Sequence, residues 1–85
     1  MNDKILDINY QFGKRIKFLR NIRKISQEEL AFRCELNTKY YSDIERGRRN
    51  PTLKELDKCA LGLGSSLEEL FKGIGHSYGN DKKYL

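Results

Sequence analysis

The sequence predicts an all-α fold, a compact bundle of five short helices, and three observations support this. Apolar residues recur at intervals of three and four in several segments. Four of the five segments follow a serine, threonine or asparagine that can cap a helix. No segment shows the sustained alternation or the Asn-Gly or Asp-Gly turn of a β-hairpin. With 85 residues, the chain has room for one core.

The first predicted helix runs from about Ile8 to Lys24. Its other faces carry several lysines and arginines, which suits a solvated surface. Gly13 costs about 1 kcal/mol in such a helix relative to alanine, so we expect a neighbouring element to come close there. One apolar stripe is formed by Ile8, Phe12, Ile16 and Leu19.

A second helix is predicted from Gln27. Ser26 and Glu29 have the spacing of a capping box, in which each side chain bonds to the other residue's backbone. Leu30, Ala31 and Cys34 form its apolar side.

The third predicted helix covers residues 38–46 and follows a turn of only three residues, 35–37. Asn37 is a suitable N-cap, and Gly47 can adopt the left-handed conformation common at helix ends. Tyr41 is expected to point inward. A turn this short forces a sharp crossing of the two helices, as in a helix-turn-helix.

Two further helices are predicted after Pro51, the only proline. Thr52 with Glu55, and Ser66 with Glu69, repeat the capping-box spacing, and glycines follow both helices. Their apolar positions are Leu53, Leu56, Ala60 and Leu63 in the fourth helix, and Leu67, Leu70 and Phe71 in the fifth.

The chain is expected to have three parts and no bound cofactor. These are an N-terminal extension (1–7), a helical domain (8–74) and a polar tail (75–85). Two separate cysteines and one histidine do not supply the four ligands of a structural zinc site, and a disulfide is not expected. Nothing indicates a small-molecule ligand. Without a signal peptide or a long apolar run, we expect a cytoplasmic protein that does not enter membranes.

The positive charge is concentrated in the first part of the chain. Residues 1–50 contain twelve Lys and Arg against seven Asp and Glu, a net charge of +5, whereas residues 51–85 contain five of each. This asymmetry is typical of a protein that binds a polyanion. A solvated basic surface without a partner would have the same composition, so charge alone favours neither.

Five motifs occur in register: Ile16-Lys-Phe-Leu-Arg20, Ser26-Gln-Glu-Glu-Leu-Ala31, Tyr41-Ser-Asp-Ile-Glu-Arg-Gly47, Asn50-Pro-Thr-Leu53 and Leu67-Glu-Glu-Leu-Phe71. Together they resemble the Cro-like (xenobiotic-response-element type) helix-turn-helix regulators over about residues 13–71. The resemblance implies a fold of the lambda-repressor-like DNA-binding type and a transcriptional regulator that binds double-stranded DNA. Because one recognition helix covers only a few base pairs, we expect a homodimer that binds a palindromic site.

The resemblance also implies which residues contact DNA. Gln27 would anchor a phosphate or buttress the recognition helix, and Lys39 can donate to guanine O6 and N7. The full set is Gln27, Asn37, Thr38, Lys39, Tyr40, Ser42, Asp43, Arg46, Arg48, Arg49 and Asn50.

Several of these positions allow two interpretations. Asp43 could accept a hydrogen bond from cytosine, but a position too far out to matter is favoured. The Tyr40 hydroxyl could meet a phosphate, or the ring could be a half-buried surface aromatic, and neither is preferred. The helix dipole accounts for Arg46, whereas phosphate contact accounts better for Arg48 and Arg49.

Two structural roles are also expected. The resemblance implies a buried ion pair between Arg20 and Glu45 that fixes the first helix against the recognition helix. A dimer surface is predicted from Leu67, Leu70 and Ile74, although these residues could instead close the bundle.

Within the family, the run Arg46–Leu53 and the small size are similar to controller proteins of restriction–modification systems. A generic regulator shares much of this run. A different class is an antitoxin whose tail, 75–85, folds on a partner toxin. An enzyme is not expected, because no nucleophile is paired with a base.

Overall fold

The computed structural model describes residues 7–75, which form five helices and no strand. The helices are α2 (Ile8–Ile22), α3 (Gln27–Arg33), α4 (Thr38–Glu45), α5 (Leu53–Leu63) and α6 (Leu67–Leu70). The all-α prediction is therefore confirmed. The predicted extension and tail lie almost wholly outside the described residues. None of the described helices is long and apolar enough to cross a membrane.

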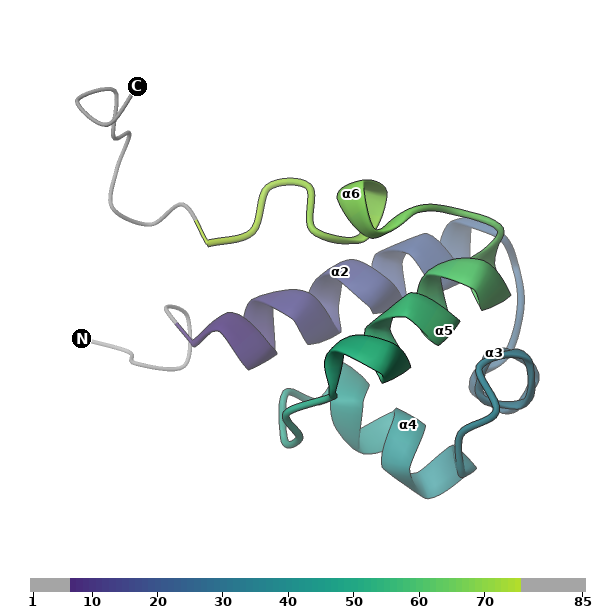
Figure 1. Ribbon diagram of the computed structural model, residues 1–85. Helices are drawn as coiled ribbons and strands as arrows, with labels where there is room; N and C mark the ends of the chain where they lie inside the picture. The colour runs from purple at the N-terminus through teal and green to yellow at the C-terminus, as the bar shows by residue number, and fades with distance from the viewer. Residues whose placement is uncertain (1–6, 76–85) are drawn as a thin grey trace, which may run out of the picture.

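The five described helices form one bundle, and α2 is the longest of them (Figure 1). Helix α2 packs against α4 and α6, α3 packs against α4 and α5, and α5 packs against α6. Helices α3 and α4 form a helix-turn-helix, and α4 lies at the outer edge of the bundle.

The predicted caps start the helices at the predicted positions. Ser26, Asn37, Thr52 and Ser66 each accept a hydrogen bond from the backbone nitrogen three residues later. Among the described residues, the reciprocal bond of a capping box is present only at Thr52, where Glu55 accepts from the Thr52 nitrogen at 2.9 Å.

Two helix ends differ from the prediction by one or two residues. Helix α2 stops at Ile22 rather than Lys24, because Lys24 adopts a left-handed conformation with φ 56°. Helix α4 stops at Glu45, and Gly47 has the left-handed φ of 76° expected of it.

Close approach at Gly13 explains a glycine in the middle of α2. A Cβ atom there would lie 2.5 Å from the carbonyl oxygen of Glu45 and 2.6 Å from that of Ile44. Helix α2 therefore crosses the end of α4 with backbone almost against backbone.

The core contains most of the apolar positions that helical periodicity predicts. Ile8 and Leu53 are instead exposed, with exposed fractions of 55% and 71%, and both lie at the first turn of their helices. Leu56, Leu67 and Phe71 are half-buried and pack against the core. The core residues are Phe12, Ile16, Leu19, Leu30, Ala31, Cys34, Tyr41, Ile44, Cys59, Ala60, Leu63 and Leu70.

The prediction of a dimer surface from Leu67, Leu70 and Ile74 is wrong for Leu70. Leu70 is fully buried, so it closes the bundle and cannot contact a second subunit. Leu67 and Ile74 are half-buried and pack against the same core.

Cys34 and Cys59 are free cysteines, and both are buried in the core. Within residues 7–75, no group of three histidine, cysteine or acidic side chains is placed to hold a metal ion.

Candidate DNA-binding surface

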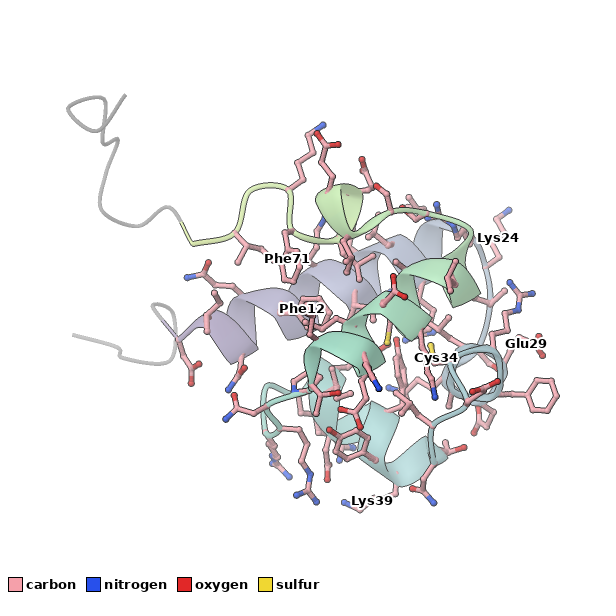
Figure 2. All side chains as sticks on the ribbon, viewed as in Figure 1. Phe12, Lys24, Glu29, Cys34, Lys39 and Phe71 are labelled. Carbon is pink, nitrogen blue, oxygen red and sulfur yellow. The ribbon has the colours of Figure 1, made fainter. Side chains whose placement is uncertain are left out.

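The first turn of α4 is open to solvent. Asn37, Thr38 and Lys39 are all exposed, and Lys39 lies at the outer edge of the molecule (Figure 2). The Asn37 Oδ1 atom accepts from the Tyr40 backbone nitrogen at 3.0 Å, so this side chain caps the helix and keeps its amide group available. A helix that presents its amino end in this way can enter the major groove of DNA.

A second group of side chains surrounds the other end of α4. Arg46, Arg48, Arg49 and Asn50 are all exposed, and Arg48 has no ion-pair or hydrogen-bond partner for its side chain among the described residues. The Asn50 Oδ1 atom accepts from Asn9 Nδ2 at 2.7 Å, which ties the loop to α2. Arg48 is thus available to meet a phosphate group, and the exposed side chains of Arg46 and Arg49 lie where they can also reach one.

Asp43 lies between these two groups. The sequence favoured a position too far out to matter, and the structure differs from this interpretation. Its side chain is only 6% exposed, so it does not project far from the surface. Lys39 Nζ lies 3.1 Å from Oδ2, with the Arg49 Nη2 atom 3.5 Å from the same oxygen, and Arg46 Nη1 lies 3.6 Å from Oδ1. The hydrogen bond from Lys39 lowers the pKa of Asp43 despite burial.

The structure limits two other predicted contacts. Ser42 is buried, so it offers little surface to DNA. Tyr40 is half-buried, its hydroxyl donates to Glu55 Oε1 at 2.7 Å, and Arg49 lies over its ring at 5.7 Å. Of the two interpretations of Tyr40, the half-buried aromatic therefore describes its position in the free protein.

The ion pair between Arg20 and Glu45 is present and lies at the centre of a larger network. Arg20 donates from Nε and Nη2 to the two carboxylate oxygens, at 2.6 and 3.1 Å. Tyr41 donates to Oε2, and Gln27 donates from Nε2 to Oε1 at 2.8 Å. Gln27 is thus placed as a buttress between α3 and α4.

This network determines the charge of Glu45. Burial by itself raises the pKa of Glu45, but the hydrogen bonds from Arg20, Tyr41 and Gln27 outweigh it, and the net pKa is below the ordinary value of 4.5. Glu45 is therefore a carboxylate at neutral pH, and it joins α2, α3 and α4.

Three hydrogen bonds that support this surface were missed in the sequence. Tyr41 is four residues before Glu45, and this helical spacing was a usable signal for their hydrogen bond. Glu55 was recognised only as a capping residue, and nothing local indicates that it also binds Tyr40. Asn9 is 41 residues from Asn50, so no sequence signal connects them.

Comparison with known proteins agrees with this geometry. The family model described as helix-turn-helix (HTH_3) matches residues 16–70. The chain belongs to the helix-turn-helix family of transcriptional regulators. Members of this family are DNA-binding regulators rather than enzymes.

The relatives of this helix-turn-helix regulator include restriction–modification proteins. Over 69 residues it is 45% identical to control protein C.MunI of Mycoplasma sp., covering 80% of this chain and 93% of that protein. It is 40% identical over 73 residues to control protein C.BamHI of Bacillus amyloliquefaciens, covering 82% and 90%.

A solved structure shows the same fold. The restriction–modification controller protein C.AhdI of Aeromonas hydrophila superposes with a TM-score of 0.73 at 40% identity, covering 74% of this chain and 96% of that one. These similarities do not favour the antitoxin interpretation.

Proposed function

We propose that this regulator binds a palindromic DNA operator as a homodimer and acts as a controller protein of a restriction–modification system. The observation that carries the proposal is the exposed amino end of α4, together with three exposed arginines at the other end of this helix. The controller role is supported by the similarity to three controller proteins, each spanned over nine-tenths or more of its length. Such a protein would act in the cytoplasm, beside the DNA.

In this proposal the side chains at the two ends of α4 contact different parts of the DNA. Thr38 and Lys39 face base edges in the major groove, where lysine can donate to guanine and threonine can pack on a thymine methyl. Arg48 and Arg49 neutralise backbone phosphates on either side of the groove. Gln27 supports α4 through Glu45 rather than through a base contact.

Two variants separate the base contact from the phosphate contact. Lys39→Ala should weaken operator binding by about 1–3 kcal/mol and relax one base preference, because it removes a reader of base edges. Arg48→Ala should weaken binding to operator and random DNA alike, and flatten the salt dependence by about 0.9 in log–log slope. Fluorescence anisotropy titrations on a duplex selected from a random pool would measure both. An equal loss of affinity for operator and random DNA in Lys39→Ala would show that Lys39 does not contact base edges.

A homodimer is needed because one recognition helix covers too few base pairs to define a genomic site. Two such helices on a two-fold axis would lie about 34 Å apart, one turn of DNA. A subunit contact close to α4 would allow this spacing.

An apolar hollow meets this condition, and we place the dimer contact there. Its volume is about 160 Å³. Leu53, which is 71% exposed, follows the lining residue Pro51 by two positions in the chain. The hollow adjoins the end of α4, because Asn9 binds Asn50 and a Cβ on Gly47 would touch the Tyr10 backbone. It is lined by Ile8, Asn9, Phe12, Pro51, Leu56 and Phe71.

The regulatory consequence follows from mass action. Occupancy of the operator would depend on the concentration of the regulator, since only dimers occupy both half-sites. Reporter fusions to the promoters of adjacent methyltransferase or endonuclease genes would test this role. Expression that does not change with the amount of the regulator would contradict it, while leaving DNA binding in place.

A further inference from the structure

One carboxylate gathers three cations of the recognition surface from three successive parts of the chain. Asp43 is contacted by Lys39 from the first turn of α4, by Arg46 from its C-cap and by Arg49 from the following loop. The Asp43 side chain is 6% exposed, while those of Lys39, Arg46 and Arg49 are 72%, 55% and 51% exposed. The anion is thus covered by cations whose charged ends still face outward.

We infer that Asp43 is a positioning residue that raises discrimination between operator and random DNA. It holds the three cations in one cluster, and it competes with phosphate groups for them. The inference rests on the proposed DNA-binding function, and it assigns Asp43 no contact with DNA.

Burial supports a positioning role over direct readout. For the Asp43 carboxylate to reach a base, the cations that cover it would have to move aside, and an anion near the phosphates would be repelled. The cations can instead turn outward without disturbing the fold, because each is at least half exposed.

The three cations differ in how firmly they are held. Arg49 is fixed twice, since it lies over the Tyr40 ring at 5.7 Å and beside Asp43, and Tyr40 is itself bound to Glu55. Lys39 has a flexible stem, and within residues 7–75 only Asp43 holds its side chain, through both carboxylate oxygens at 3.2 and 3.1 Å. Lys39 is therefore the cation whose freedom depends most on Asp43.

Competition of this kind acts unequally on the two kinds of DNA. On random DNA, Lys39 can exchange the Asp43 carboxylate for a phosphate, and this exchange of one anion for another adds little binding free energy. The operator also offers a base edge, which adds discrimination that a phosphate cannot supply. Asp43 should therefore weaken binding to random DNA more than binding to the operator.

The test is Asp43→Asn, which keeps the shape of the side chain and removes its charge. We expect tighter binding to random DNA, with a log–log salt slope steeper by about 0.9, because Lys39 becomes free for one more phosphate. The ratio of operator to random affinity should fall about tenfold. The matched control is Asp57→Asn, which makes the same charge change at an exposed position on α5 and should leave the ratio unchanged.

A double variant separates the released cation from the change in total charge. Lys39→Gln with Asp43→Asn restores the net charge, and it should return the salt slope on random DNA to the wild-type value. A slope that stays steep in the double variant, or an unchanged affinity ratio in Asp43→Asn, would overturn the inference.

The outcomes also separate this inference from the proposed function. If the wild-type protein binds no duplex, the proposed function fails before Asp43 is tested. If it discriminates between duplexes while Asp43→Asn and Asp57→Asn behave alike, only the inference fails. Should Asp43→Asn not fold, carboxyl NMR titration of wild type and Lys39→Gln replaces it. The pKa of Asp43 should rise in Lys39→Gln and change when operator binds, and a pKa that does neither contradicts the inference.

Discussion

At the scale of single residues, two helix ends use a left-handed conformation without glycine. Lys24 has φ 56° and Glu35 has φ 60°, and each follows the C-cap of its helix. Both positions allow the next backbone nitrogen to bond back into the helix, from Ile25 to Arg20 and from Leu36 to Ala31. A residue with a Cβ atom is less stable than glycine in this conformation by about 1–2 kcal/mol.

Lys24→Gly is therefore expected to stabilise the protein. The relief of the left-handed conformation exceeds the added entropy of the unfolded chain, which leaves a gain of about 0.5–1 kcal/mol. Lys24→Ala is the control, because it removes the same exposed side chain and keeps the Cβ atom. Urea unfolding would measure both, and an equal effect of the two variants would contradict the explanation.

Glu45 makes the stability depend on acid pH. Its pKa is lower in the folded protein than the ordinary 4.5, so the folded state holds fewer protons. The stabilisation is complete above about pH 4.5 and is lost as the pH falls through the folded-state pKa. We expect the free energy of unfolding to fall more between about pH 5 and 3 in the wild type than in Glu45→Gln. Equal losses would show that Glu45 does not carry this dependence.

At the scale of elements, the crossing of α2 and α4 positions the recognition helix. Gly13 allows the two backbones to meet, and the Arg20–Glu45 pair closes the same junction a few residues further along. Removing one partner of a buried pair costs about 3–5 kcal/mol, because it leaves the other charge buried without compensation. The pair and the close crossing together join α4 to α2.

Gly13→Ala sets two effects against each other. Alanine is better than glycine by about 1 kcal/mol in an isolated helix. Here its Cβ would lie 2.5 Å from the carbonyl oxygen of Glu45, so the helices must separate, and overpacking of this kind costs about 1–3 kcal/mol or more. We expect Gly13→Ala to lower the melting temperature. The control is Asn21→Ala, at an exposed site on the same helix, which should not lower it. A more stable Gly13→Ala would show that α2 and α4 can separate freely.

Helices and their starts are predictable from the sequence because they depend on local chemistry. Asn37 and Thr52 mark helix starts through bonds that span three residues. Asp43 could not be placed in this way, because its burial depends on cations from separate segments. Likewise, helical spacing marks Leu53 and Leu70 as apolar, but only packing shows that one is exposed and the other buried.

At the scale of the whole molecule, the proposed dimer depends on the hollow beside α4. Leu53 and Leu61 lie on the same helix and are each 71% exposed, which makes them a matched pair. Leu53→Gln should raise the dimer dissociation constant by about tenfold or more, because a two-fold contact loses the burial of two leucines. Leu61→Gln should leave it unchanged. Sedimentation equilibrium would measure both dissociation constants. A larger increase for Leu61→Gln than for Leu53→Gln would place the contact on another face.

The charge of the whole chain supports binding without selecting a sequence. The net charge of +5 attracts any DNA, so affinity for random duplexes is expected to fall steeply with salt. Specificity must come from the few side chains that reach base edges, and it is this part of the account that a footprint can test.

The most direct measurement is a dimethyl sulfate footprint on a duplex selected from a random pool, with the protein at saturation. The reagent methylates guanine at N7, which lies in the major groove, and adenine at N3, which lies in the minor groove. We expect protected guanine N7 atoms in two half-sites about one helical turn apart, with protection at one position lost in Lys39→Ala. A saturated complex with every guanine N7 still reactive, or no complex with any duplex at low salt, would contradict this expectation.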